Sequence, residues 1–158
     1  MSTVNKATEQ PLPFDCQTSP KQVMTEKLHL LCVDDEEHIL HTLKRFCRNE
    51  GIEIHTATSA AEALTILENE PINIIISDYQ MPHINGLDLL EQVHLRWPKI
   101  VRIILSGFVS IPLISQAQQR GDIFAFMGKP WAREELKSLI ENAFIHYKSC
   151  ICGEKHLP

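Results

Sequence analysis

The sequence predicts an α/β protein in which five strands alternate with five helices around a parallel sheet. Short apolar runs of strand length recur along the chain, and the segments between them carry apolar residues at helical spacing. The run from Ile72 to Ser77 is nearly all β-branched and apolar, which is typical of a central parallel strand covered on both faces. This alternation favours an α/β sandwich with right-handed crossovers, while the local pattern leaves the strand order open.

In the first half of the chain, short apolar runs predict three strands, at residues 28–33, 52–56 and 72–77. A helix is expected over residues 36–50, where apolar residues share one face and Gly51 supplies the stop. Ser59, with Glu62 three residues later, has the spacing of a capping box and predicts the start of the second helix.

In the second half, two further strands are expected, at residues 100–105 and 123–127. A loop over 81–86 leads into a third helix, which ends at Trp97 because Pro98 cannot continue it. The fourth helix, over residues 110–119, has only a weak apolar stripe. The fifth, over 131–147, carries a clear stripe formed by Leu136, Leu139, Ile140, Ala143 and Phe144.

Length and composition indicate one soluble domain. The chain of 158 residues can build a single core and is too short for two domains of ordinary size. A formal net charge of -5, without a basic stripe, offers no general attraction to nucleic acid. No stretch approaches the ~20 apolar residues that a membrane span needs, and the N-terminus lacks the pattern of a secretory signal. The five cysteines form an odd set without framework spacing, so a reducing, cytoplasmic location is expected.

The regular pattern covers residues 27–147, which we expect to form the folded domain. Residues 1–26 contain three prolines among polar residues and a single aromatic, so they are expected to form a flexible leader. Residues 148–158 are too few for another domain and are expected to form a short C-terminal tail.

Polar side chains follow four of the five predicted strands. Asp34 and Asp35 follow the first strand, Asp78 the third, Ser106 the fourth and Lys129 the fifth. Ligands of open α/β sheets bind beyond the carboxyl ends of the strands, so these side chains are expected to face one site. Oxygen ligands select a hard cation, which indicates Mg²⁺ or Mn²⁺, and a carboxylate beside such an ion can attack phosphorus. The ion, an ammonium and a hydroxyl would then stabilise the charge of the transferring phosphoryl group.

The segments that carry this chemistry resemble the four signatures of two-component response-regulator receiver domains. They are Val33-Asp34-Asp35-Glu36, Ser77-Asp78-Tyr79-Gln80-Met81-Pro82, Leu105-Ser106-Gly107 and Gly128-Lys129-Pro130. The resemblance covers about residues 28–147, and the joint match in order and spacing is specific although each piece alone is weak. It implies a flavodoxin-like, doubly wound (βα)5 fold with strand order 2-1-3-4-5.

For the metal, the resemblance implies four residues. Asp78 is the phosphoacceptor, Asp35 is a direct magnesium ligand, and Asp34 positions metal-bound water. The backbone carbonyl of Gln80 completes the protein's share of the metal shell.

For the phosphoryl group and its readout, the resemblance implies contacts from Ser106 and Lys129, and a cis peptide between Lys129 and Pro130. Phe126 matches the aromatic switch position, where many receivers have Tyr. Movement of Ser106 towards the phosphate would let Phe126 turn inward and change the surface formed by the fourth helix, the fifth strand and the fifth helix.

The resemblance also implies partners and a role without conventional enzymatic turnover. A histidine kinase or a histidine phosphotransfer protein would donate the phosphoryl group, and a downstream protein or a second copy of the chain would read the switched surface. The Lys129-Pro130-Trp131 run resembles a chemotaxis-regulator-like receiver subgroup often joined to cyclic-dinucleotide phosphodiesterase or transcriptional-activator modules. Direct contact with nucleic acid or membrane is not expected.

Two alternative functions remain open from the sequence. A pseudo-receiver would bind protein without accepting phosphate, but Asp35, Asp78 and Lys129 are all present. A phosphatase of the haloacid-dehalogenase type would also use an aspartate and Mg²⁺, but its nucleophile follows the first strand in an Asp-x-Asp pattern. Here the best nucleophile follows the third strand.

The C-terminal segment holds a separate set of metal donors. His146, Cys150, Cys152 and His156 offer two imidazoles and two thiols within a short span, which is a tetrahedral zinc set in composition. The Cys-x-Cys spacing is tighter than that of common zinc sites. A zinc site and an unstructured tail therefore stay as alternatives.

Overall fold

The computed structural model describes residues 27–107 and 111–156, with side chains as far as Ile151. Five strands and five helices alternate along these residues. The strands are β1 (His29–Val33), β2 (Glu53–Ala57), β3 (Ile74–Ser77), β4 (Val101–Ser106) and β5 (Ala125–Gly128). The helices are α4 (Glu37–Glu50), α5 (Ala60–Asn69), α6 (Gly86–Arg96), α7 (Ile111–Arg120) and α8 (Arg133–His156).

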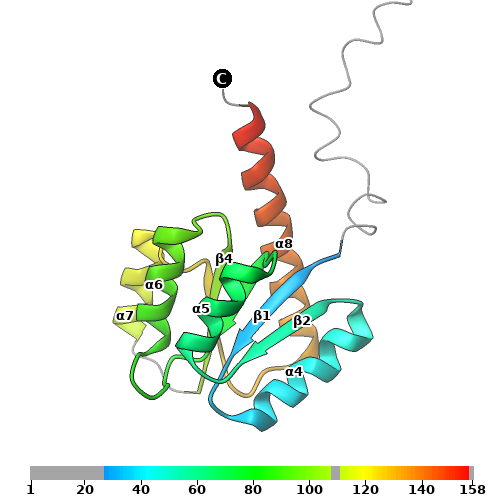
Figure 1. Cartoon of the computed structure of the whole chain (residues 1–158), viewed down its shortest axis with the longest axis vertical. Helices are drawn as coiled ribbons and strands as arrows, with labels where there is room; N and C mark the ends of the chain where they lie inside the picture. The colour runs from blue at the N-terminus through cyan, green and yellow to red at the C-terminus, as the bar shows by residue number, and fades with distance from the viewer. Residues whose placement is uncertain (1–26, 108–110, 157–158) are drawn as a thin grey trace, which may run out of the picture.

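The strands form one parallel sheet in the order β2-β1-β3-β4-β5, which confirms the flavodoxin-like prediction. Helices cover both faces of the sheet (Figure 1). Helices α5, α6 and α7 pack on one face around Leu31, Ile75 and Ile104. Helices α4 and α8 pack on the other face around Leu30 and Ile74. Each apolar stripe predicted from the sequence therefore meets an almost fully buried strand.

The strand register brings the predicted polar residues to one edge. Val33 at the end of β1 pairs with Ser77 at the end of β3, and Ser106 at the end of β4 pairs with Gly128 of β5. The residue after each of these strands therefore lies at the carboxyl edge, where ligands of such sheets bind.

The predicted capping box at the start of α5 forms with one change. The Ser59 hydroxyl accepts from the Glu62 backbone N–H at 3.2 Å, as predicted. The Glu62 carboxylate accepts from the backbone N–H of Thr58 at 2.6 Å rather than from that of Ser59. This contact lowers the pKa of Glu62. The backbone N–H groups of Thr58 and Glu62 thus both have a side-chain acceptor at the helix start.

The last helix is longer than predicted. It continues from Tyr147, where its packing against the sheet ends, to His156. The sequence after Tyr147 contains no proline before Pro158, so nothing forces the helix to stop where its core contacts stop. Figure 1 shows this end of α8 rising beyond the sheet.

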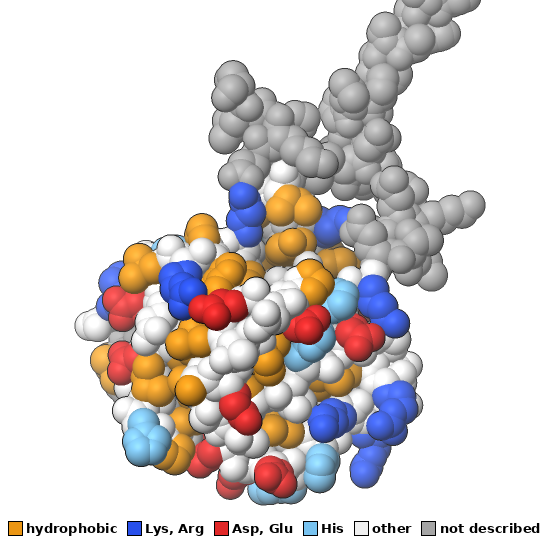
Figure 2. Space-filling view, in the orientation of Figure 1, with side chains coloured by type: hydrophobic (Ala, Val, Ile, Leu, Met, Phe, Trp, Pro, Cys, Tyr) orange, Lys and Arg blue, Asp and Glu red, His pale blue; other side chains and the backbone are white. Residues whose placement is uncertain are grey.

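The outer surface carries mixed charge. On the face in Figure 2, basic and acidic side chains lie among each other rather than in a stripe of one sign. Within the described residues, no helix has both the length and the apolar character of a membrane span.

Arg102 is a buried cation in the fully buried strand β4. Its guanidinium donates to the backbone carbonyls of Asp122 at 2.8 Å, Gly121 at 2.9 Å, Ile100 at 2.6 Å and Pro98 at 3.1 Å. Burial lowers the pKa of Arg102, and the nearby negative charge of Asp122 counteracts this effect. Arg102 thus ties the end of α7 to the start of β4 at the edge of the sheet opposite the predicted site.

We expect Arg102→Met to lower the free energy of unfolding by about 2–4 kcal/mol, because several buried carbonyls lose a charged donor. Urea denaturation measures the change. Arg45→Met, at an exposed position of α4, is the matched control and should change stability by less than about 0.5 kcal/mol. Equal stability of the two variants would show that Arg102 does not hold this edge.

Candidate functional site

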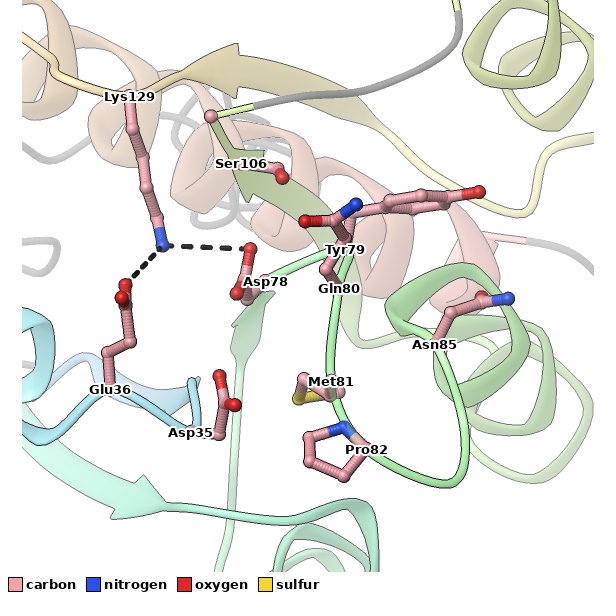
Figure 3. A pocket seen from close by; sticks show the side chains of 11 residues that line it. Asp35, Glu36, Asp78, Tyr79, Gln80, Met81, Pro82, Asn85, Ser106 and Lys129 are labelled. Atoms are coloured by element: carbon pink, nitrogen blue, oxygen red, sulfur yellow. Dashed lines mark ion pairs between the residues drawn. The ribbon is translucent and has the colours of Figure 1, made fainter.

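A cleft of about 640 Å³ opens at the carboxyl edge of the sheet. Figure 3 shows carboxylates from the β1 and β3 ends facing a lysine from the β5 end. The lining residues are Asp35, Glu36, Asp78, Tyr79, Gln80, Met81, Pro82, Asn85, Ser106, Gly107 and Lys129. The structure therefore brings together the predicted residues from all four strand ends.

Three carboxylates form the acidic part of this cleft. One oxygen each from Asp34, Asp35 and Asp78 lies within 4.8 Å of the others. Asp34 is 3% exposed and Asp78 7%, whereas Asp35 is exposed. The backbone N–H of Glu36 donates to Asp34 Oδ1 at 2.9 Å and fixes that carboxylate.

Lys129 is the cation that faces these carboxylates. Its Nζ lies 2.8 Å from Asp34 Oδ2, 3.6 Å from Asp78 Oδ1 and 3.7 Å from Glu36 Oε1. Burial alone would lower the pKa of Lys129, but its hydrogen bond to Asp34 and the surrounding negative charges raise it above the ordinary value. Lys129 is therefore charged at neutral pH and is held closest to Asp34.

The buried Asp78 has a pKa above its ordinary value. Burial is the main cause that raises its pKa, and the negative charge of Asp34 adds to it. The Lys129 charge, the Ser106 hydroxyl and the Tyr79 backbone N–H oppose this rise without cancelling it. Ionised Asp78 is therefore short of positive charge in this cleft, and a divalent cation would supply it.

The donor set fits a hard divalent ion. All three side chains offer carboxylate oxygens, and in the described part of the chain no other group of three acidic, histidine or cysteine residues could hold a metal. Mg²⁺ accepts a few carboxylates and keeps several waters, so space remains for a phosphate oxygen. The acidic triad therefore fits a Mg²⁺ ion.

The backbone after β3 is fixed from two sides. Asp78 N–H donates to Val33 O at 2.9 Å, and Gly86 N–H donates to Tyr79 O at 2.8 Å. A Cβ at position 86 would collide with the backbone carbonyl of Asp78, so the close approach requires glycine. Asn85 caps α6 by accepting from Asp88 N–H at 2.9 Å. These contacts set the direction of the Asp78 side chain.

The remaining predicted residues lie around the cleft or beside it. The Lys129–Pro130 peptide is cis, as expected. Gln80 lines the cleft, next to the acidic triad. Phe126 does not line it: this side chain lies on the edge strand β5 and is 36% exposed.

Two contributors to the cleft, Glu36 and Gly86, were not predicted from the sequence. Glu36 has the features of a solvated helix start, yet its carboxylate pairs with Lys129 and lines the cleft. Gly86 is a loop residue in the sequence, and only the fold shows how closely it approaches Asp78. The signal for Glu36 was its place directly after the acidic pair, but Gly86 gave no local signal.

Fold and site together define a phosphoacceptor signalling module rather than a conventional enzyme. Residues 30–141 match the family described as "Response regulator receiver domain". The chain therefore belongs to the response-regulator receiver family. The predicted role in signalling by aspartate phosphorylation is confirmed at the level of this family, and the phosphatase alternative is not supported.

Similar proteins agree with this assignment. The chain is 33% identical over 114 residues to the hydrogenase transcriptional regulatory protein HoxA of Cupriavidus necator, covering 72% of this chain and 23% of HoxA. A signal receiver domain of an HD domain-containing protein from Pseudomonas fluorescens is 31% identical with a TM-score of 0.75, covering 78% of this chain and 99% of that one. The beryllofluoride-activated NtrC4 receiver domain dimer is 28% identical with a TM-score of 0.71, covering 75% and 98%. The chain spans about a quarter of the length of curated relatives such as HoxA.

We expect Asp78→Asn to stabilise the metal-free protein at neutral pH. A raised pKa in the folded state means that ionising Asp78 costs stability, and this cost is complete once the pH exceeds the folded-state pKa. The advantage of Asp78→Asn should therefore shrink as the pH falls towards the ordinary aspartate pKa of about 3.9. Urea denaturation in EDTA at several pH values tests this, with the exposed Asp88→Asn as control. A neutral-pH destabilisation by Asp78→Asn would contradict the electrostatic account.

Proposed function

We propose that Asp78 accepts a phosphoryl group from a histidine kinase or a histidine phosphotransfer protein in a reaction that requires Mg²⁺ or Mn²⁺. The observation that carries this proposal is the position of Asp78, which is almost buried within one cleft beside Asp34, Asp35 and Lys129. Receiver domains receive phosphoryl groups from histidine kinases, and this cleft has the charges that the transfer needs.

In the proposed reaction, a carboxylate oxygen of Asp78 attacks phosphorus while the bond from phosphorus to the donor's imidazole nitrogen breaks. Asp35, Asp78 and the Gln80 carbonyl would hold the metal, and Asp34 would position metal-bound water. The metal would supply positive charge to the phosphoryl oxygens. Lys129 already lies 3.6 Å from Asp78, so its ammonium can contact the new phosphoryl oxygens with a small movement. The Ser106 hydroxyl, which now bonds Asp78, would donate to the same group.

The proposed readout begins at Ser106. When its hydroxyl moves to the phosphoryl group, space opens for Phe126 to turn from its half-exposed position towards the core. Helix α7, which lies between these residues in the chain, has only Ile114 and Ala117 buried, so it is weakly held. Ile111 is 58% exposed on the same helix and offers apolar surface to a downstream protein or to a second copy.

The proposal also includes the subgroup of receivers to which the chain belongs and its location in the cell. We place the chain in the chemotaxis-regulator-like, Lys-Pro-Trp subgroup on the basis of Lys129, Pro130 and Trp131. Relatives include a transcriptional regulator and a receiver from an HD domain-containing protein, which fits the output modules expected for this subgroup. A cytoplasmic location and the absence of direct nucleic-acid contact remain predictions of the sequence.

Acetyl phosphate with Mg²⁺ should add one phosphoryl group to the intact chain, measured by intact mass. Asp78→Asn should abolish the added mass, and EDTA should do the same because the cleft needs a cation to offset its charge. Asp122→Asn is the matched control, because Asp122 is as buried as Asp78 but lies near the opposite edge of the sheet. Labelling of Asp78→Asn at the wild-type level would refute the assignment of the acceptor.

Beryllofluoride, a phosphate mimic, should shift amide NMR signals in α7, in β5 and around Trp131 as well as at the cleft. The physical reason is that Ser106 and Lys129 connect the acceptor to β4 and β5. Ser106→Ala should keep the shifts near Asp35 and Asp78 but reduce those at Phe126. Shifts confined to the loops after β1 and β3 in the wild type would mean that phosphate binds without a transmitted switch.

A further inference from the structure

The end of α8 carries a pair of metal donors that the phosphoacceptor site does not use. His146 and Cys150 are four residues apart and both exposed, and Cys150 Sγ lies 3.7 Å from His146 Nε2. Residues at this spacing lie on the same face of a helix, one turn apart. The two donors are therefore preformed as neighbours.

The separation of these donors matches two corners of a tetrahedral zinc site. Zinc–sulfur bonds of about 2.3 Å and zinc–nitrogen bonds of about 2.0–2.1 Å place the two ligand atoms roughly 3.6 Å apart at a tetrahedral angle. The His146 ring also packs on Phe124, with ring centroids 4.8 Å apart, which restricts its orientation. The pair needs little rearrangement to chelate an ion.

The surroundings of the pair leave room and supply charge balance for a thiolate. A hollow of about 210 Å³ beside it is lined in part by Arg102, Phe124, His146 and Cys150. The guanidinium of Arg102, fixed by four backbone carbonyls, lines the same hollow as Cys150, and the thiolate is the form that binds metal.

A single helix cannot complete the site. Backbone positions 150 and 152 of α8 are roughly 200° apart around the helix axis at 100° per residue, so the second Cys–His pair starts from a different side. Among residues whose side chains the structure describes, no third histidine, cysteine or acidic donor joins His146 and Cys150. The described side chains of one copy therefore supply two donors, and a tetrahedral site needs four.

We propose that two copies of this chain share one Zn²⁺, bound by His146 Nε2 and Cys150 Sγ of each copy. Two equal pairs related by a two-fold axis supply the four N and S ligands of a structural zinc site. Two thiolates also balance the charge of the ion.

The position of the pair allows this arrangement. The last α8 residues that pack against the sheet are Phe144 and Tyr147, and the helix then continues away from the domain (Figure 1). Ile145, next to the pair, is 65% exposed, and Figure 2 shows hydrophobic and basic side chains where α8 leaves the domain. A second copy can approach here without contact with the acidic cleft, which lies at the other edge of the sheet.

The two metal preferences are separate. The acidic cleft offers carboxylate oxygens, which suit Mg²⁺, whereas the α8 pair offers nitrogen and sulfur, which suit Zn²⁺. Pairing through α8 would therefore be independent of phosphorylation at Asp78.

The test uses the full chain, stripped of metal and kept reduced with a phosphine, in excess Mg²⁺. Added ZnCl₂ should double the molar mass measured by light scattering, with one zinc per two chains. Co²⁺ in place of Zn²⁺ should give cobalt–thiolate charge-transfer bands and the strong visible absorption of a tetrahedral site. Asp78→Asn should leave both results unchanged.

Two double variants of the same composition separate the proposal from its alternatives. His146→Gln with Cys150→Ser should abolish the zinc-dependent dimer and weaken zinc binding by more than roughly 100-fold, since loss of outer partners alone costs 10–100-fold. Cys152→Ser with His156→Gln should leave the dimer intact. The proposal is overturned if zinc leaves the chain monomeric, if one ion binds per chain, or if the second variant rather than the first loses the dimer.

Discussion

Two almost buried carboxylates, those of Asp34 and Asp78, lie at the ends of adjacent strands, and burial together with the negative charge of Asp34 raises the pKa of Asp78. The Lys129 ammonium offsets part of this repulsion from 2.8 Å and 3.6 Å. Asp34 and Lys129 are 95 positions apart in the sequence, so their contact exists only when β1, β3, β4 and β5 are in register. The ion pair therefore ties the chemistry of the cleft to the complete sheet. A protein with any strand displaced would hold uncompensated charge in its core.

The same imbalance explains why the cleft suits both a cation and a phosphoryl group. Three carboxylates and Glu36 outweigh one lysine, so the cleft attracts positive charge. A divalent ion would offset most of this excess negative charge, and the oxygens of a phosphoryl group would then face the ion's charge, Lys129 and the Ser106 hydroxyl.

Much of this arrangement could be predicted from the sequence because the required information is local. Apolar runs such as Ile74–Ile76 mark strands, and the polar residue after each run marks the carboxyl edge of a parallel sheet. The strand order did not follow from such patterns and came from the resemblance of the motifs. In α4, Leu40 is buried and Ile39 packs against the same core while only partly buried, because the rotation of the helix depends on its packing partner.

The rest depended on contacts between distant segments. Glu36 has the sequence features of a solvated residue, and its role appears only when β5 brings Lys129 to it. The length of α8 was also missed, since core contacts decide which helical face is buried but not where a helix without a breaker stops. Arg102 illustrates the same limit, because an arginine within an apolar strand can be buried only when other segments supply acceptors. Here four backbone carbonyls outside the strand accept its hydrogen bonds.

The contact between Gly86 and the Asp78 carbonyl has a consequence for how the cleft can move. The backbone of the acceptor and the first turn of α6 touch directly, and the Gly86–Tyr79 hydrogen bond closes the loop between them. The loop after β3 and the start of α6 form this side of the cleft, and they cannot separate without breaking the backbone contact. The opposite side reaches Asp78 through two side chains, Ser106 and Lys129, which can change rotamer while the strands stay paired. The absence of a side chain at position 86 thus fixes one side of the cleft by backbone contact, whereas side chains that can rotate form the other side.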